Sequence, residues 1–363
     1  MTFRDFFNSV KAKIRGAYSS AICRGVCLIL IFAAVISFSA CGNDDAPMKK
    51  TYYEYFDTVC VISYYGDRGE EYFSEMADFI EGELDRYHRL FDAYNPYAGM
   101  NNLYTVNASA GASPVVVDGE LFALLSYGKE VYTLTGGEIN IAIGAVTSLW
   151  KAAERADGNT DEVLPTAEEL AAAAEHISID LICTDEGASS VYISDPLALI
   201  DVGALGKGFA AERIAEGLKA RGEDSFVLDL GGNIRAIGSK PDGSGWITGI
   251  ENPHTDGSNP FAARVELSDC SCVTSGDYRR YFTVDGKKYH HIIDGDTLYP
   301  AEYFSSVTVI ASDSALCDAL STALFCMPFT EGLALIEATD GAEAFWISVD
   351  GEYFYSSGFS TLD

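Results

Sequence analysis

The sequence is poor in basic side chains and in residues that bind metals through nitrogen or sulfur. Its 363 residues include 24 Lys and Arg against 54 Asp and Glu, and only five His. Proteins that bind nucleic acid need a basic surface to displace the counterions around phosphates, so the net charge of −30 argues against a nucleic-acid partner. No Cys and His residues have the spacing of a zinc site. An anionic ligand would therefore need a metal ion, a lysine or backbone N–H groups to hold it.

The chain also lacks internal repeats, and after residue 50 it has no linker rich in Pro, Ser or Gly. Disorder is excluded by composition, because 48% of the residues are hydrophobic and 12% are aromatic. A length of 363 residues is compatible with one large or two modest domains. These features predict one compact domain of the α+β class.

The first forty residues differ from the rest. Five basic residues and one acidic residue precede an apolar run at 26–40, which is shorter than the roughly 20 residues of a membrane span. Such a segment is typical of a secretory signal. Ser39 and Ala40 precede Cys41 as in a bacterial lipobox, so we expect a signal peptide at 1–40, lipidation of Cys41 and a location on the cell membrane facing outside the cytoplasm. The alternatives are an ordinary signal peptide or an N-terminal anchor, because Phe38 replaces the usual leucine.

Beyond the signal segment, residues 41–50 are expected to form a polar tether and 51–363 the folded domain. Residues 41–363 carry 19 basic and 53 acidic side chains, a charge of −34. The spacing of the cysteines after Cys41 suits a disulfide framework poorly, so buried free thiols are expected. These cysteines are Cys60, Cys183, Cys270, Cys272, Cys317 and Cys326.

Hydrophobic periodicity and turn residues predict the order of the elements. Helices are expected at 70–91, 119–134, 206–221 and 314–327, and after Pro165, where Thr166 and Glu169 form a capping box. Strands are expected at 52–65, around 191, at 226–230 and at 307–311. Asp-Gly turns at 285–286 and 350–351 predict hairpins with strands at 278–284 and 287–293, and at 345–349 and 352–355.

Two glycine-containing stretches are candidates for ligand contact. DVGALGKG at 201–208 opens a predicted helix, where glycines let the backbone approach a ligand and N-terminal amides favour anions. Lys207 would add a positive charge there. CVTSGDY at 272–278 places small hydroxyl residues before a strand. Each stretch is equally compatible with a structural turn.

Two of the five histidines are adjacent, in YHHIIDGDT at 289–297. Neighbouring residues of a strand face opposite sides, so at most one of His290 and His291 is expected to point into a site. The alternative is a histidine that is hydrogen-bonded for structure alone.

The stretch DALST at 318–322 contains a carboxylate within an apolar run. On a helix, Asp318, Ser321 and Thr322 share one face. A carboxylate buried there needs a partner or a cation, and hard oxygen ligands suit magnesium. The alternative is an aspartate that caps the start of the helix.

In this order, these stretches resemble motifs of the FAD:protein FMN transferase (ApbE) family. The resemblance runs from about residue 53 to 329. Its motifs here are FDTV at 56–59, FDAY at 91–94, TGGEINIAIG at 135–144 with Leu149 and Trp150, DVGALGKG at 201–208, LGGNIR at 230–235, TSGDY at 274–278, HIID at 291–294 and DALST at 318–322. The resemblance implies an ApbE-like domain of mixed strands and helices after the signal segment.

The reaction implied by this resemblance splits FAD at its pyrophosphate in the presence of Mg²⁺. FMN passes to a threonine or serine hydroxyl of a partner protein, and AMP leaves. The implied partners are FAD and an acceptor protein such as a subunit of a membrane flavin-dependent redox complex.

The resemblance also implies roles for individual residues. His291 would be the base, since a histidine pKa near 6.5 suits proton transfer at neutral pH, and Asp294 would orient it. The implied metal ligands are the Ala204 carbonyl, Asp318, Ser321 and Thr322. The implied FAD-contacting positions are Phe56, Tyr94, Glu138, Ile139, Asn140, Asp201, Lys207 and Ile292. Phe56 or Tyr94 could pack on the isoalloxazine ring.

The sequence departs from the family pattern at several of these motifs. Asp57 stands where glycine is usual, Phe56 where methionine is frequent, and Asn140 where an aspartate is usual. Gly295 and Leu298 replace the proline and glycine of a turn, and Ser321 stands where some members have a second metal-binding aspartate. These differences put individual contacts in doubt rather than the fold.

Two other functions are compatible with the same motifs. An FAD pyrophosphatase would use water in place of the protein hydroxyl. A non-catalytic flavin-binding lipoprotein would only carry the ligand. His291 together with the stretch at 318–322 favours an enzyme, because storage of a ligand requires no base.

Overall fold

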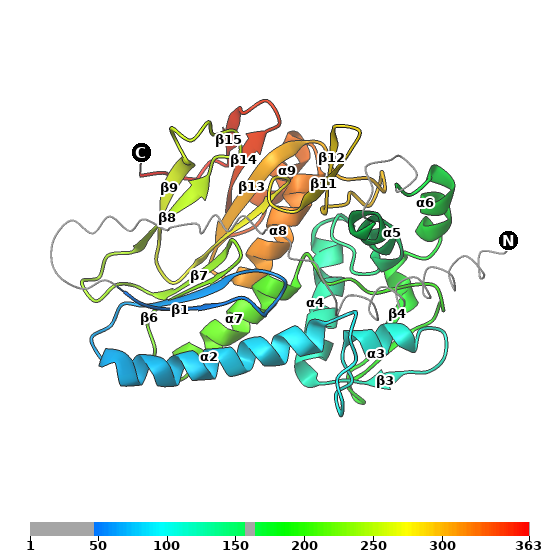
Figure 1. Ribbon diagram of the computed structural model, residues 1–363, viewed down its shortest axis with the longest axis horizontal. Coiled ribbons are helices and arrows are strands. Elements are labelled where there is room, and N and C mark those ends of the chain that lie inside the picture. Colours follow the sequence, from blue (N-terminus) through cyan, green and yellow to red (C-terminus); the bar gives the residue numbers. More distant parts are fainter. Residues whose placement is uncertain (1–46, 157–163, 363) are drawn as a thin grey trace.

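The computed structural model describes residues 47–156 and 164–362, and its centre is an eight-stranded antiparallel sheet (Figure 1). The strand order is β1-β2-β6-β7-β10-β13-β14-β15. The strands are β1 (Met48–Tyr52), β2 (Cys60–Tyr64), β6 (Ser225–Leu230), β7 (Asn233–Gly238), β10 (Ser271–Gly276), β13 (Phe304–Ala311), β14 (Glu343–Ser348) and β15 (Tyr353–Tyr355). Four helices lie with one face of this sheet: α2 (Gly69–Phe91), α7 (Gly206–Lys219), α8 (Ser314–Cys326) and α9 (Phe329–Glu337).

Both faces of the sheet are buried. Residues of β14 alternate between two cores, with Ala344 and Trp346 packed under the helices and Phe345 and Ile347 packed against a separate hairpin. That hairpin consists of β8 (Trp246–Glu251) and β9 (Phe261–Leu267), and it buries Trp246 completely. The sheet therefore lies between a helical layer and a two-stranded ribbon.

The remaining elements form the part of the molecule drawn at the right of Figure 1. They are α3 (Leu103–Ala108), α4 (Gly119–Leu134), α5 (Gly144–Arg155), α6 (Ala167–Ala174), a 3₁₀ turn (Ile179–Leu181) and a sheet of β3 (Val115–Val116), β5 (Ser190–Ile193) and β4 (Ile182–Asp185). A hairpin of β11 (Tyr281–Val284) and β12 (Lys287–His290) is separate from both sheets. The α+β class is confirmed.

Elements with strong local signals are found where the sequence predicts them. Helix α2 buries Met76, Ile80 and Leu84 on one face, as its periodicity requires. Thr166 and Glu169 form the expected capping box before α6. The turn between β11 and β12 has positive φ at Asp285 and Gly286, the geometry that an Asp-Gly hairpin turn requires.

The predicted strand over 52–65 is wrong, because the chain reverses within it. Phe56 and Asp57 have φ values of 54° and 52°, in the left-handed region that strand residues do not adopt. The reversal pairs Tyr52 with Cys60 and makes two antiparallel strands. The boundary of the tether at 41–50 is also wrong, since β1 starts at Met48 and residues 48–50 belong to the sheet.

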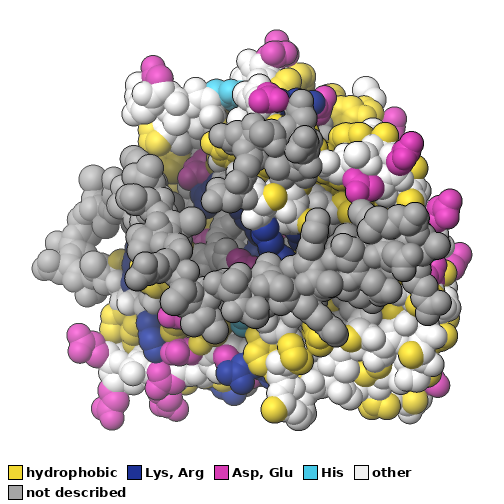
Figure 2. Space-filling model, turned by 45° about the vertical axis from the view of Figure 1, so that its right-hand side comes forward, with side chains coloured by type: hydrophobic (Ala, Val, Ile, Leu, Met, Phe, Trp, Pro, Cys, Tyr) yellow, Lys and Arg dark blue, Asp and Glu magenta, His cyan; other side chains and the backbone are white. Residues whose placement is uncertain are grey.

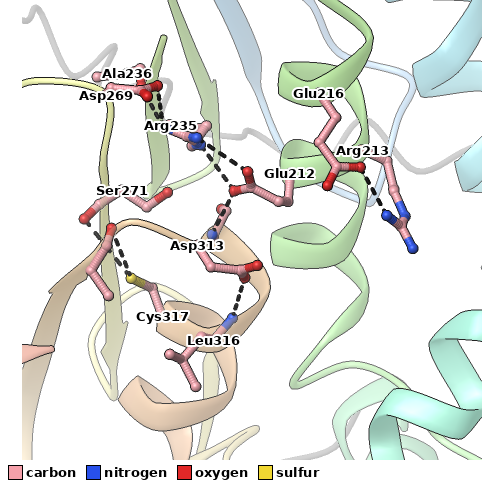
Figure 3. A network of polar contacts seen from close by, with 12 residues as sticks. Glu212, Arg213, Glu216, Arg235, Ala236, Asp269, Ser271, Asp313, Leu316 and Cys317 are labelled. Atoms are coloured by element: carbon pink, nitrogen blue, oxygen red, sulfur yellow. Dashed lines mark hydrogen bonds and ion pairs between the residues drawn. The ribbon is translucent and has the colours of Figure 1, made fainter. Parts of the chain in front are cut away.

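A buried ion pair connects the helical layer to the sheet and to the start of α8. Arg235 of β7 is 1% exposed and contacts Glu212 of α7 through Nε (2.9 Å) and Nη2 (3.1 Å). The Glu212 carboxylate also accepts the backbone N–H of Ser314 at 2.8 Å. Figure 3 shows the two contacts between Arg235 and Glu212. Glu212 therefore holds α7 and α8 in a fixed arrangement, and both helices contribute to the site described below.

Arg235→Met is expected to lower the free energy of unfolding by about 3–5 kcal/mol, because it leaves the Glu212 carboxylate buried without its cation. Urea unfolding measures the loss. Lys287→Met is the control, since it removes an exposed pair with Glu302 (3.0 Å) that contributes about 0–1 kcal/mol. Equal losses in the two variants would contradict this role of Arg235.

Candidate active site

The start of α7 lies directly against α8. The backbone N–H of Gly208 donates to the Asp318 carboxylate at 2.8 Å. A Cβ atom at Gly208 would collide with the Ser314 carbonyl and with the Cβ of Asp318, so the approach requires glycine. The predicted glycine-rich stretch and the predicted acidic stretch are therefore one site, with Ala204 in the turn just before α7.

Asp318 is a buried carboxylate whose only ion pair among the described residues is a long one. Asp318 is 3% exposed, and its charged partner is Lys207, whose Nζ lies 3.8 Å from Oδ1. Burial raises the pKa of Asp318, although Lys207 and the Gly208 N–H partly offset the effect. Asp318 does not cap α8, because Asp313 occupies that position and accepts from the Leu316 N–H.

Hydroxyl groups gather beside this carboxylate on the same helix. The Ser275 hydroxyl of β10 lies 2.9 Å from that of Ser321 and 3.1 Å from that of Thr322. Ser321 also donates to the Asp318 backbone carbonyl at 3.0 Å. Ser275 belongs to the TSGDY stretch, and the sequence did not predict it near the metal ligands. The reason is that Ser321 lies 46 residues further along the chain, so no local pattern connects the two.

The donor set here fits a hard cation such as Mg²⁺. It offers one charged carboxylate and neutral hydroxyl oxygens, and the residue most in need of a cation is the buried Asp318. Within 47–156 and 164–362, no group of three or more His, Cys, Asp or Glu side chains is arranged to hold a metal ion. A cation would therefore complete its shell with hydroxyls, a carbonyl, water and substrate phosphates, as Mg²⁺ commonly does.

His291 lies just after β12, and its side chain is exposed while that of His290 is buried. Its Nδ1 is 3.1 Å from the Arg280 carbonyl. A carbonyl only accepts, so Nδ1 carries the proton and Nε2 is the free basic atom. Surrounding protein atoms desolvate the ring, and this, with the charges of Arg280 and Lys207, lowers the pKa of His291.

His290 has a structural role. It is 6% exposed, donates from Nε2 to the Ala301 carbonyl at 2.7 Å, and accepts the Ile292 N–H at Nδ1. The expectation that at most one of the two histidines points into a site agrees with this arrangement.

Asp294 does not orient His291, contrary to the role that the resemblance implies. Its carboxylate accepts the N–H groups of Asp296 and Thr297 and so closes the turn after β12. The backbone carbonyl of Arg280 takes its place as the partner of His291. The physical reason is that Asp294 is 4% exposed and its Oδ1 accepts two backbone N–H groups of its own turn.

Acidic groups gather around Glu138. Burial and the charges of Asp296 and Asp294 raise the pKa of Glu138 to about 7. This carboxylate is thus unsuited to lie against a phosphate, and any contact with FAD at Glu138 would involve an uncharged part of the cofactor.

Asp201 is held by α5. Its Oδ2 accepts from Thr147 Oγ1 and Lys151 Nζ, each at 2.6 Å, and its Oδ1 accepts the Gly203 N–H at 2.9 Å. Burial alone would raise the pKa of Asp201, but Lys151 and these hydrogen bonds lower it to about 2. Asp201 is therefore an ionised anchor for the turn before α7.

Sequence reasoning missed Lys151, which lies over the Tyr94 ring with its Nζ 5.5 Å from the centroid. Arg155 lies 5.1 Å from the same centroid. A signal was present, because Thr147 and Lys151 are four residues apart and so share one face of α5.

Four other predicted contact residues are placed differently. Phe56 donates its N–H to His88 Nδ1 at 3.2 Å, and no contact with the groups above is found among the described residues. Ile139 and Ile292 are buried in the main core, and Asn140 binds the Ile177 carbonyl at 2.7 Å. For the two buried isoleucines, contact with a ligand would be through backbone atoms. Cys41 lies outside the described residues.

The charge distribution favours an anionic ligand locally. On the face shown in Figure 2, a group of Lys and Arg side chains lies near the middle, and many Asp and Glu side chains lie around the margin. A glycine at a helix start, a lysine, a buried carboxylate with hydroxyls and an exposed histidine are groups that enzymes acting on phosphorylated substrates combine in their sites.

The chain belongs to the ApbE family, whose model matches residues 56–346. It is similar to the FAD:protein FMN transferase of Treponema pallidum, with 36% identity over 270 residues that cover 70% of this chain and 73% of that protein. It is also similar to an FAD:protein FMN transferase of Klebsiella pneumoniae, with 30% identity over 263 residues, 71% of this chain and 79% of that protein.

Solved structures agree with this assignment. The ApbE protein of Thermotoga maritima has a TM-score of 0.74 and 27% identity, covering 86% of this chain and 97% of that one. The flavin transferase ApbE of Vibrio cholerae has a TM-score of 0.73 and 25% identity, covering 86% of this chain and 99% of that one.

Proposed function

We propose that this chain transfers FMN from FAD to a threonine or serine hydroxyl of an acceptor protein, with Mg²⁺, and releases AMP. The observation that carries the proposal is that Lys207 pairs with the buried Asp318, beside the hydroxyls of Ser321 and Thr322, and that the charge of Lys207 also reaches His291, whose Nε2 is free. Relatives named FAD:protein FMN transferase support it.

The residues divide the work between binding and proton transfer. The start of α7 presents backbone N–H groups and Lys207 to the phosphates of FAD. His291 Nε2 takes the proton of the incoming hydroxyl, while the Arg280 carbonyl keeps the other nitrogen protonated. Ser275 supports Ser321 and Thr322 in position from β10.

Asp318, Ser321, Thr322 and the Ala204 carbonyl would hold Mg²⁺ in this proposal. Bound there, the ion would supply positive charge to the phosphate oxygens on which negative charge develops. The positive charge of the ion would also explain how a strongly acidic protein binds an anionic cofactor.

Hydrolysis of FAD to FMN and AMP is the second candidate. The exposure of His291 favours it, because water can reach the same base. The two activities differ only in the nucleophile.

The decisive experiment is to incubate the full-length chain with FAD, Mg²⁺ and an acceptor flavoprotein domain. A gain of one FMN in the mass of the acceptor, with in-gel flavin fluorescence and release of AMP, is expected. Release of AMP without flavin on the acceptor would instead establish the hydrolase, and neither product would overturn both candidates.

The proposals for the acceptor and for the location rest on the family resemblance and on the lipobox-like residues before Cys41. We propose a membrane redox complex subunit as acceptor and a lipid anchor at Cys41 as the attachment. Within the described part of the chain, no helix is both long and apolar enough to span a membrane.

Cys41→Ser is expected to release the protein from the membrane fraction or to leave the precursor uncleaved, because the thiol is the site of lipid attachment. Fractionation and the mass of the mature chain measure this. Cys183→Ser is the control, since Cys183 is an exposed free thiol within the folded domain. Unchanged processing and membrane attachment in the Cys41 variant would contradict the lipobox.

A further inference from the structure

The cations around the β11–β12 hairpin are paired with carboxylates, with one exception. Lys287 contacts Glu302 at 3.0 Å, Lys288 contacts Asp277 at 2.5 Å, and Arg279 contacts Glu251 at 2.7 Å. The exception is Arg280, whose guanidinium has no ion pair or hydrogen bond among the described residues. In a chain with more than twice as many acidic as basic residues, an arginine left without a carboxylate stands out as a cation available to a ligand.

Arg280 lies opposite His291 at the end of the hairpin. Tyr281 and His290 are the last pair of the ladder, and Arg280 and His291 are the residues that adjoin this pair outside the two strands. The imidazole of His291 lies 3.1 Å from the carbonyl of Arg280 through Nδ1, so the side chain of His291 is held against the backbone of Arg280.

Two positive charges act on His291 from different elements. Arg280 acts from the hairpin and Lys207 from the start of α7, and both lower the pKa of the imidazole. Carboxylates, by contrast, surround Glu138. A phosphate is therefore favoured beside His291, where the nearest charges are positive, rather than beside Glu138.

We propose that Arg280 binds a phosphate oxygen of the substrate diphosphate beside His291. This rests on the proposed function, which supplies FAD as the substrate. The guanidinium presents several N–H donors in one plane, a geometry that matches phosphate oxygens better than an ammonium group does.

The role is electrostatic, and Arg280 exchanges no atoms. In transfer, the acceptor oxygen forms a bond to the phosphorus of the FMN half, and the bond from that phosphorus to the bridging oxygen breaks. The electron pair of the broken bond leaves with AMP, and the hydroxyl proton goes to Nε2 of His291. Arg280 stabilises the charge on the phosphate oxygens during this exchange.

The test compares FAD with riboflavin, which carries no phosphate. Arg280→Met is expected to weaken FAD binding about ten- to a hundredfold, the range for a charge-assisted hydrogen bond, and to leave riboflavin binding within about twofold. Arg280→Lys should recover part of the loss. Quenching of flavin fluorescence measures both affinities, and Lys287→Met on the same hairpin is the control.

Unchanged FAD affinity in Arg280→Met would overturn the proposal, and so would equal weakening of FAD and riboflavin, which would indicate a structural role. The binding result is independent of catalysis. If Arg280→Met loses affinity for FAD but not for riboflavin, while the wild-type chain transfers no FMN, the proposed function is overturned and the Arg280 assignment stands.

Discussion

Asp318→Asn is expected to reduce FMN transfer by about a thousandfold or more, with little rescue by excess Mg²⁺, because it removes the charged metal ligand of the site. The asparagine oxygen can still accept the Gly208 N–H that Asp318 accepts at 2.8 Å, so the contact between α7 and α8 remains. Transfer rates across an Mg²⁺ titration measure the effect.

Stability separates a functional loss from a folding defect in this variant. Burial disfavours the ionised form of Asp318, so its replacement by a neutral isostere should leave the melting temperature unchanged or raise it. Asp340→Asn, at an exposed position after α9, is the matched control and should retain full activity. Wild-type activity that is equal in Mg²⁺ and in excess chelator would rule out the metal site.

His291→Asn is expected to lower the transfer rate by about 10²–10⁴-fold while FAD affinity changes by no more than a few fold, since a general base contributes to that extent. An asparagine N–H can still donate to the Arg280 carbonyl. Single-turnover transfer and flavin fluorescence give the two quantities.

His254→Asn is the appropriate control. His254 is also an exposed histidine, but its hydrogen-bond partner is the Ser348 carbonyl, which is not one of the site groups. His290→Asn would be a poor control, because His290 is buried and its substitution should lower stability. If the His291 variant loses FAD binding and stability together, its role is structural rather than catalytic.

The dependence of wild-type transfer on pH follows from the pKa of His291. Desolvation, then Arg280, Lys207 and His290, lower the pKa of His291 below 6.5. A lowered pKa keeps the neutral, basic form populated as the pH falls. The acid limb of kcat/KM should therefore lie below pH 6.5, and a limb at or above that value would exclude His291 as the base.

The sequence by itself determined the elements whose signals are local. The periodicity of α2, the capping box before α6 and the Asp-Gly turn of β11–β12 depend on residues within a few positions of one another. The same is true of the shared face of Asp318 and Thr322 on α8, which follows from helical spacing. Features of this kind depend only on residues close together in the sequence, so they can be predicted from a short stretch of the chain.

Only the tertiary structure decided how these pieces meet. The reversal at Phe56 and Asp57 allows β1 to pair with β2, which no local pattern specifies. Lys151 reaches Asp201 across 50 residues, and His291 takes the Arg280 carbonyl instead of Asp294 as its partner. Ion pairs and hydrogen bonds between distant segments depend on how helices and strands pack, and packing is a property of the whole chain rather than of a sequence window.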